Sequence, residues 1–226
     1  MSIFSINKNK LILVGGNYNN HEVIYKLNKL NLDTAIIYTK LNHTKLKHIY
    51  EITILEKDNS YSNMCGNGCI ALCIKLKNDI ILVNKLNKQI YVFYKINKII
   101  LQLSIELIEH NTYSISGEPH KVYYTKDYNE TYHKKIGHSN LPNFNTTFIF
   151  NKNNNYYFVT FERGVNNITK SCGTGSFASI YFINNNIDKN INKILTLENN
   201  IYSFEKNSNQ YSLIYNITNN EIINII

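Results

Sequence analysis

The sequence contains no tryptophan, and only two prolines and nine glycines among its 226 residues. Because flexible linkers and disordered segments are usually rich in proline, glycine and polar residues, this scarcity argues against long linkers. No run of about 18 apolar residues occurs, so we expect no membrane-spanning helix. The start of the chain also lacks a basic segment followed by an apolar stretch, so we expect no secretory signal peptide.

The chain also lacks a dense block of basic residues, although its formal net charge is +8. A basic protein can bind nucleic acid when lysines and arginines are clustered on one face or along one segment. Here the lysines are scattered among asparagine and isoleucine, as in residues 7–10 and 189–193. No nucleic-acid-binding motif is present. We therefore expect neither nucleic acid nor a membrane as a partner.

Two short segments of the chain are similar to each other. The run from Met64 to Gly68 is MCGNG, and the run from Ser171 to Gly175 is SCGTG. In each, a cysteine precedes a Gly-x-Gly turn, and an apolar segment of helical type follows. Close to half the length of the chain separates Cys65 from Cys172. We therefore predict a duplicated unit, with one cysteine in each half.

The length and composition fit two halves with cores of their own. Hydrophobic residues make up 43% of the chain, and 226 residues suffice for one large domain or two of about 110. We predict an N-terminal half over residues 1–111, which carries Cys65. A C-terminal half over residues 112–226 carries Cys172.

Each half is predicted to be mostly strand with one central helix, which is an α+β arrangement. The spacing of apolar residues predicts helices over residues 21–30, 66–77, 128–136 and 173–184. Strands are expected over residues 11–14, 34–38, 49–55, 80–83, 90–96, 99–108, 122–124, 147–150, 156–161, 195–197, 201–204 and 211–217. Residues 117–120 are expected to form a loop.

A cysteine that precedes Gly-x-Gly at the start of a helix is suited to a particular kind of chemistry. The helix N-terminus leaves free N–H groups and carries a partial positive charge, and glycines let a ligand approach the backbone closely. Such a turn is an anion-binding site with a thiol at its edge. The same field favours the thiolate over the thiol, so we expect reactive cysteines at positions 65 and 172.

Two such turns suggest chemistry on a single carbon atom. If both held one carboxylate, the two sulfurs would lie on opposite faces of the carbon attached to it. One thiolate could then remove a proton from one face while the other thiol returned a proton to the opposite face. The two helix dipoles would stabilise the intermediate carbanion through its carboxylate. The pattern therefore indicates stereochemical inversion by acid–base catalysis.

Other interpretations of the four cysteines stay open. Cys69 and Cys73 follow Cys65 on one helical face among apolar neighbours, so we expect them in the core. A zinc site is disfavoured, because structural zinc ligands usually come as two close pairs and Cys172 stands alone. A structural disulfide is not expected in the reducing cytoplasm, where we place the chain. A Cys-His hydrolase would leave the second cysteine motif unexplained.

With these motifs in hand, the chain resembles the diaminopimelate epimerase family of amino-acid racemases. The run from Met64 to Gly68 is similar to the family's first cysteine motif, and the run from Glu162 to Gly175 is similar to its second. Gly117-x-Pro119-His120 is similar to the family's Gly-x-Pro-His loop. The matching motifs span residues 56–180. The resemblance implies two similar halves, each with a mostly antiparallel sheet or barrel around a central helix, and a site in the cleft between them.

The resemblance also assigns roles to particular residues. It implies that Cys65 and Cys172 are the acid and base, that Glu162 holds the reacting amino group, and that Arg163 and Asn145 hold the distant end of the substrate. It implies that backbone groups hold the reacting carboxylate, and these belong to Gly66, Asn67, Gly173 and Thr174. It implies no metal and no cofactor. His120 is interpreted as part of the loop rather than as a chemical group.

The chain departs from the family pattern at several substrate-binding positions. The family's N-terminal Gly-Asn-Asp-Phe pattern is degraded, with Asn9 as its best match and Asn17 as the rival. Glu56 stands where the family usually has asparagine, and Glu118 where it often has asparagine or a small residue. These changes leave the cysteine chemistry intact, and the added carboxylates would suit a more cationic substrate side chain.

The sequence thus predicts a cofactor-independent enzyme that converts LL-diaminopimelate to meso-diaminopimelate, in lysine or cell-wall synthesis. One alternative is a racemase of another amino acid, such as histidine, with the same two-thiol chemistry. Another is a cysteine-rich metal-binding module without catalysis. A small amino acid is the expected partner in the first two cases. The sequence leaves open whether the chain forms a homodimer.

Overall fold

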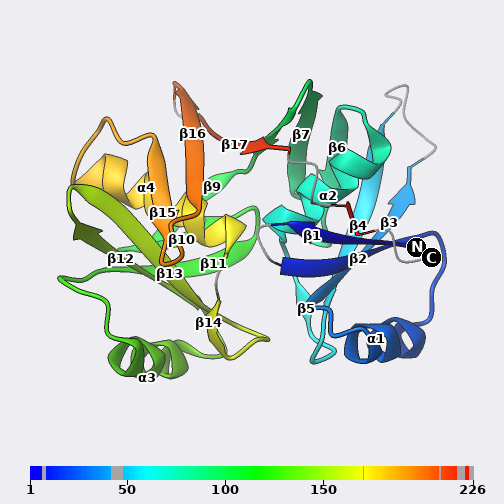
Figure 1. Cartoon of the computed structure of the whole chain (residues 1–226), viewed down its shortest axis with the longest axis horizontal. Coiled ribbons are helices and arrows are strands. Elements are labelled where there is room, and N and C mark those ends of the chain that lie inside the picture. The colour runs from blue at the N-terminus through cyan, green and yellow to red at the C-terminus, as the bar shows by residue number, and fades with distance from the viewer. Residues whose placement is uncertain (7–8, 42–47, 170, 209, 218–221, 224–226) are drawn as a thin grey trace. The chain divides into compact units, whose positions relative to one another are not determined.

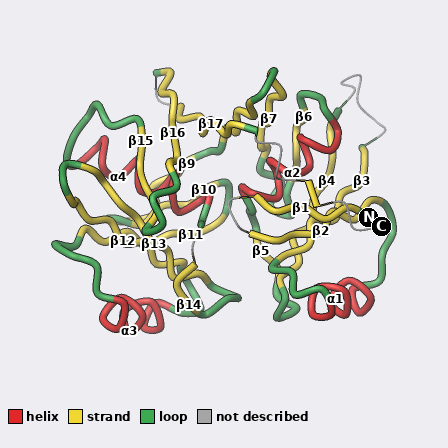
Figure 2. The backbone as a smooth tube through the Cα atoms, in the orientation of Figure 1, coloured by secondary structure: helices red, strands yellow, loops and turns green. Residues whose placement is uncertain are grey.

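The computed structural model describes residues 1–6, 9–41, 48–169, 171–208, 210–217 and 222–223. The chain divides into two compact units (Figure 1). The first unit comprises Met1–Gln102 and Ile214–Ile226, and the second comprises Leu103–Leu213. Both units contain helices as well as strands, as Figure 2 shows.

In the first unit, strands surround one buried helix. Its elements are β1 (Ser2–Ile6), β2 (Asn9–Gly15), α1 (Asn20–Lys29), β3 (Thr34–Lys40), β4 (Ile49–Glu56), β5 (Tyr61–Ser62), α2 (Gly66–Leu76), β6 (Ile80–Val83), β7 (Gln89–Lys95), β8 (Lys98–Gln102) and β18 (Ile222–Ile223). Strand β2 pairs antiparallel with β1 and parallel with β3. Strand β4 pairs antiparallel with β3 and β5 and parallel with β6, which pairs antiparallel with β7.

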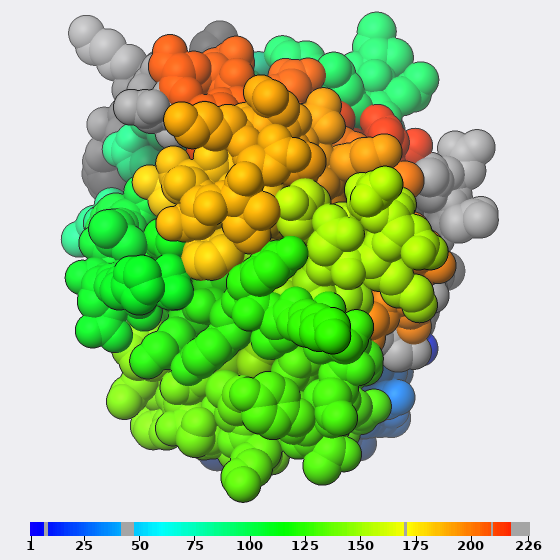
Figure 3. Space-filling model, turned by 90° about the vertical axis from the view of Figure 1, so that its left-hand side faces the viewer, coloured from blue at the N-terminus to red at the C-terminus, as the bar shows by residue number. Residues whose placement is uncertain are grey.

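The second unit repeats this plan. Its elements are β9 (Ile105–Glu109), β10 (Thr112–Ile115), β11 (Glu118–Tyr124), α3 (Glu130–Asn140), β12 (Asn145–Lys152), β13 (Asn155–Glu162), β14 (Asn167–Thr169), α4 (Gly173–Asn186), β15 (Lys193–Thr196), β16 (Ile201–Asn207) and the start of β17 (Gln210–Asn216). Figure 3 shows one face of this unit, where the green and yellow-green residues around α3 fill the lower part.

The two units share one order of strand pairings. Strand β11 pairs antiparallel with β10 and parallel with β12. Strand β13 pairs antiparallel with β12 and β14 and parallel with β15, which pairs antiparallel with β16. Each of these pairings has its counterpart in the first unit. The prediction of an α+β fold with two pseudo-symmetric halves is confirmed.

The division between the units lies elsewhere than the predicted boundary at residues 111 and 112. The chain leaves the first unit after Gln102, because β9 pairs with β10 and so belongs to the second unit. The chain returns to the first unit at Ile214. There β18 pairs antiparallel with β1. The last part of the chain is thus grouped with the first unit, whereas the predicted C-terminal half included it.

The four helices are of two kinds. Residues 66–74 of α2 and 173–180 of α4 are all buried, as expected for helices that are apolar on every side. Helices α1 and α3 instead have exposed polar faces, and they begin after Asn19 and Asn129. The side chain of each of these asparagines accepts a hydrogen bond from a backbone N–H of the first turn, a common helix N-cap. No helix among the described residues is long and apolar enough to span a membrane.

The structure differs from the prediction at the segment 117–120. This segment was expected to be a loop, but strand β11 begins at Glu118. The reason is that the turn occupies the residues before it, where Ser116 and Gly117 have φ of 49° and 93°. Pro119 is tolerated because the parallel pairing of β11 with β12 starts only at His120. The single strand predicted over residues 99–108 is also two strands, β8 and β9.

His133 on α3 gives a first prediction, about stability and pH. Its side chain is buried, its ring stacks on Phe148 with 4.1 Å between centroids, and neither ring nitrogen has a hydrogen-bond partner among the described residues. Burial lowers the pKa of His133. A group whose folded-state pKa is lowered favours the folded state above its unfolded pKa of about 6.5, and this contribution is lost as the pH falls through the folded value.

We therefore expect His133→Phe to be more stable than the wild type. Its free energy of unfolding at pH 7.5 should be higher by about 1–3 kcal/mol, because an unpartnered buried polar group is removed. This difference in the free energy of unfolding should be larger at pH 5, where protonation of His133 in the unfolded state destabilises the wild type. Urea unfolding at the two pH values measures both effects. Tyr132→Phe, which changes a neighbouring side chain but removes no imidazole, is the control. An equal increase in stability at both pH values would contradict a lowered pKa of His133.

Candidate functional site

Cys65 lies immediately before helix α2, at its N-cap position. Its backbone is extended, with φ −134° and ψ 103°. Its Sγ accepts a hydrogen bond from the N–H of Gly68 at 3.4 Å. The side chain is partly exposed. The cysteine therefore occupies the helix N-terminus that the Cys-Gly-x-Gly pattern predicts.

Cys172 has the same geometry at helix α4. Its φ is −132° and its ψ is 109°, and its Sγ accepts from the N–H of Gly175 at 3.3 Å. The backbone angles of the two cysteines thus agree within a few degrees, at equivalent places in two pseudo-symmetric units. Cys172 differs in burial, since only 6% of it is exposed.

The first turn of each helix provides the groups expected to hold an anion. In α2 these are Gly66 and Asn67, and in α4 they are Gly173 and Thr174, all of them buried. First-turn N–H groups have no partner within the helix and lie at its positive end. Neither helix has an acidic side chain in its first turn. Each turn can therefore bind a carboxylate oxygen.

The third helical residue is a glycine packed closely against a strand in both units. A Cβ atom at Gly68 would overlap the side chain of Ile36 on β3, and a Cβ at Gly175 would overlap the hydroxyl of Thr160 on β13. These strands pack directly against the helix starts. The N–H of each glycine donates to the sulfur of its N-cap cysteine.

The environment of Cys172 corrects one expectation. The helix N-terminus was expected to favour the thiolate, but burial raises the pKa of Cys172 well above its ordinary value, and the negative charge of Glu162 adds to the shift. Hydrogen bonds from Thr174 and from the N–H of Gly175 lower the pKa only in part. Cys172 is thus a thiol at neutral pH, because desolvation of the charge outweighs the helix field.

His120 takes part in the second site, although the sequence indicated only a structural role in a loop. Its side chain is fully buried. Its Nε2 lies 2.8 Å from Oγ1 of Thr174, and its Nδ1 lies 3.0 Å from Oγ1 of Thr147. Thr174 in turn lies 3.4 Å from Sγ of Cys172. Burial, with a smaller effect of the Arg163 charge, lowers the pKa of His120 to about 3, so the ring is neutral and fixes the position of Thr174.

A glutamate ends the equivalent strand in each unit. Glu56 is the last residue of β4 and accepts hydrogen bonds from the hydroxyls of Thr34 at 2.8 Å and Ser62 at 2.7 Å. Glu162 is the last residue of β13 and accepts a hydrogen bond from the hydroxyl of Thr169. From the sequence, the two glutamates were interpreted separately. Their similar distance before the two cysteines was the available signal that they are equivalent.

Arg163 and Asn145 lie together, but a third residue joins them. Arg163 Nη2 lies 2.6 Å from Oε1 of Glu118, which also accepts a hydrogen bond from Nδ2 of Asn145 at 2.8 Å. The backbone N–H of Arg163 donates to Oδ1 of Asn145 at 2.8 Å. The sequence marked Glu118 only as a departure from the family pattern. In the structure, Glu118 binds both of the residues that were expected to hold the distant end of the substrate.

Asn9 is the better placed of the two N-terminal candidates. It is the first residue of β2, the position that Glu118 occupies in β11, and its Oδ1 is buried without a hydrogen-bond partner among the described residues. Asn17 is exposed in the turn that follows β2. Asn9 therefore has an acceptor still to be satisfied, as a ligand-binding side chain would.

The two remaining cysteines lie inside α2. Cys69 and Cys73 are fully buried, and burial raises the pKa of Cys73 to about 12. Within the part of the chain that the structure describes, no group of three or more His, Cys, Asp or Glu side chains is placed to hold a metal ion.

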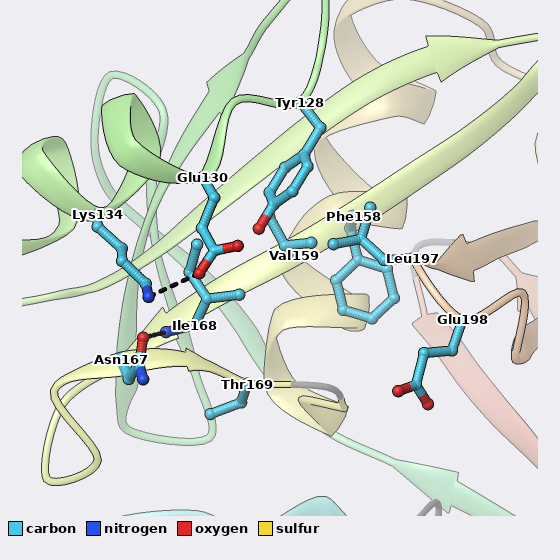
Figure 4. Close-up of a pocket in the computed structure, with 10 residues that line it drawn as sticks. All are labelled: Tyr128, Glu130, Lys134, Phe158, Val159, Asn167, Ile168, Thr169, Leu197 and Glu198. Atoms are coloured by element: carbon cyan, nitrogen blue, oxygen red, sulfur yellow. Dashed lines mark hydrogen bonds and ion pairs between the residues drawn. The ribbon is translucent and has the colours of Figure 1, made fainter.

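A separate pocket of about 260 Å³ lies on the second unit, between α3, β13, β14 and the turn after β15 (Figure 4). An ion pair of 2.6 Å between Glu130 and Lys134 lies in its wall. None of the predicted site residues lines it. The pocket is therefore distinct from the cysteine site.

Comparison with known proteins identifies the fold. No family model and no curated protein sequence matches the chain. A PhzF-family phenazine biosynthesis protein from Enterococcus faecalis matches in structure with a TM-score of 0.64 at 10% identity, over 95% of this chain and 94% of that one. A predicted epimerase from Pseudomonas aeruginosa matches with a TM-score of 0.63 at 8% identity, over 95% of this chain and 94% of that one.

A probable proline racemase from Agrobacterium radiobacter K84 gives a TM-score of 0.58 at 9% identity, over 94% of this chain and 87% of that one. All three similarities extend over nearly the whole chain, so they include both units. At these identities they establish the fold alone. The chain has the same fold as these PhzF-family and proline racemase structures.

Proposed function

We propose that this chain is an isomerase that inverts the α-carbon of an amino acid, with the thiols of Cys65 and Cys172 as its acid and base and without a cofactor. One observation carries the proposal. Both cysteines are N-caps of buried helices at equivalent places in two pseudo-symmetric units, with nearly identical backbone angles and the same Sγ hydrogen bond. A structural core cysteine would not need this arrangement twice. Two proteins with the same fold, a predicted epimerase and a probable proline racemase, agree with it by name.

The reaction needs four contributions. The first-turn N–H groups of α2 and α4 would bind the substrate carboxylate, and Glu162 would hold the α-ammonium group. One sulfur, as thiolate, takes the α-proton, so the electron pair of the C–H bond passes to the carbon and its carboxylate. The other sulfur, as thiol, gives a proton to the opposite face. Since burial keeps Cys172 protonated, it would be the donor in the first turnover, and Cys65 the base.

Two substrates are in question. The resemblance of the motifs favours LL-diaminopimelate, converted to the meso form in lysine or cell-wall synthesis. The alternative is another amino acid, such as histidine, and the ion pair between Arg163 and Glu118 favours it. In both cases the cysteine chemistry is the same.

The test is one incubation of reduced protein with amino acids in heavy water, with deuterium and stereochemistry followed at the α-carbon by NMR. We expect deuterium to appear only together with inversion, because the proton returned comes from solvent through the second thiol. Inversion of LL-diaminopimelate would identify the reaction and the substrate at once. If no amino acid exchanges its α-proton, the proposal fails, and the metal content of the protein is the next measurement.

A further inference from the structure

In the second unit, the residues expected to hold the far end of a substrate already have partners within the protein. Arg163 uses Nη2 for Glu118 at 2.6 Å, and its Nη1 donates to the carbonyl of Pro142 at 3.4 Å. The amide of Asn145 is engaged at both atoms, by Glu118 and by the N–H of Arg163. The Nη1 and Nη2 atoms of Arg163 therefore both have partners, whereas its buried Nε has none among the described residues. The Nη1–Nη2 fork is thus not free for a second carboxylate.

The charges of this cluster also cancel. Glu118 is buried, with 4% exposure, and the guanidinium of Arg163 is its ion-pair partner. A substrate carboxylate that took Arg163 for itself would deprive the buried charge of Glu118 of its ion-pair partner, which is unfavourable. If Arg163 stayed with Glu118, the incoming carboxylate would find the positive charge of Arg163 already neutralised. Both routes penalise a ligand that is anionic at its far end.

We propose, on the basis of the function proposed above, that the Glu118–Arg163–Asn145 cluster selects against a distal carboxylate, so that the substrate is an amino acid with a single carboxylate. The cluster adjoins the reacting end of the site, because Arg163 directly follows Glu162, whose charge acts on Cys172. Specificity of this kind arises from a repulsive element added to an otherwise unchanged catalytic centre. It excludes LL-diaminopimelate and retains the two-thiol reaction.

L-lysine and LL-diaminopimelate form a matched pair for the test, because they differ only by the distal carboxylate. We expect the wild-type protein to bind L-lysine at least tenfold more tightly than LL-diaminopimelate and to exchange its α-proton at least tenfold faster. Glu118→Gln keeps the shape and a carbonyl acceptor but removes the charge, so the positive charge of Arg163 is no longer neutralised. In this variant the ratio should shift at least tenfold towards LL-diaminopimelate.

Glu130→Gln is the control, because it removes the carboxylate of another ion pair in the same unit, an exposed one with Lys134 on α3. It should leave the ratio unchanged. Ligand-dependent thermal unfolding measures binding, and α-deuterium exchange measures turnover. The binding readout does not depend on catalysis, so Glu118→Gln must gain affinity for LL-diaminopimelate even if no variant turns over.

The outcomes separate the two proposals. Wild-type exchange of LL-diaminopimelate as fast as of L-lysine would overturn the inference and leave the proposed function in place. If no amino acid exchanges its α-proton, the proposed function is refuted. The ratio of the affinities for L-lysine and LL-diaminopimelate would then test the inference by itself. If Glu118→Gln gains no affinity for LL-diaminopimelate, the selection by charge is refuted.

Discussion

Cys172→Ser and Cys65→Ser are each expected to lower α-proton exchange by about 10²–10⁴-fold, the usual contribution of one acid–base group. A serine hydroxyl is a far weaker acid and base than a thiol at neutral pH, and each face of the α-carbon depends on one sulfur. Deuterium exchange at the α-carbon, followed by NMR for each variant beside the wild type, gives the rates. Because the α2 and α4 helices keep a hydroxyl at the N-cap, a good capping group, the fold should be retained.

Cys73→Ala provides the comparison that separates chemistry from packing. It removes a thiol from the interior of α2, where the side chain is fully buried. It should lower stability through the lost packing while leaving the exchange rate of the folded protein close to that of the wild type. Full activity in either serine variant would refute the two-base mechanism, whatever the substrate.

Gly175→Ala is expected to have the second large effect, on both stability and turnover. The added methyl group would overlap the hydroxyl of Thr160 and lie 3.2 Å from Sγ of Cys172. Overpacking of this kind costs about 1–3 kcal/mol of unfolding free energy. Displacement of the sulfur by a fraction of an ångström should also slow exchange, by up to about 10²-fold. Urea unfolding and α-deuterium exchange measure the two effects.

Thr160→Ala tests whether the overlap is the cause. This variant removes the hydroxyl that the new methyl group would meet, at the cost of its contact with Thr147 at 3.2 Å. In the double variant, Gly175→Ala should therefore cost at least about 1 kcal/mol less than it does alone, a coupling that a double-mutant cycle measures. Strictly additive losses would show that the glycine is needed for another reason.

The elements nearest to the cysteines could be predicted from the sequence because their signals are local. The start of α2 at Gly66 and of α4 at Gly173 follows from the Cys-Gly-x-Gly pattern and the apolar run after it. The strand from Ile80 to Val83 was also predicted with its observed bounds. Such signals depend on neighbours within one turn or one strand, which the sequence displays directly.

The polar contacts of the site could not be predicted in the same way. Glu118 and Arg163 are 45 positions apart, and they meet only because β12 pairs with β11 on one side and β13 on the other. The protonation of Cys172 likewise depends on how deeply the strands around α4 bury it. Burial and partners of a charged group are properties of tertiary packing, and a motif describes only the group itself.

The return of the chain to the first unit has a consequence for the order of folding. Strand β18 pairs with β1, so the first unit includes residues that are synthesised after the whole of the second unit. The second unit is continuous in sequence and can form while the ribosome is still adding the C-terminal segment. We therefore expect the second unit to reach its native state first. The first unit would complete its sheet only when β18 pairs with β1.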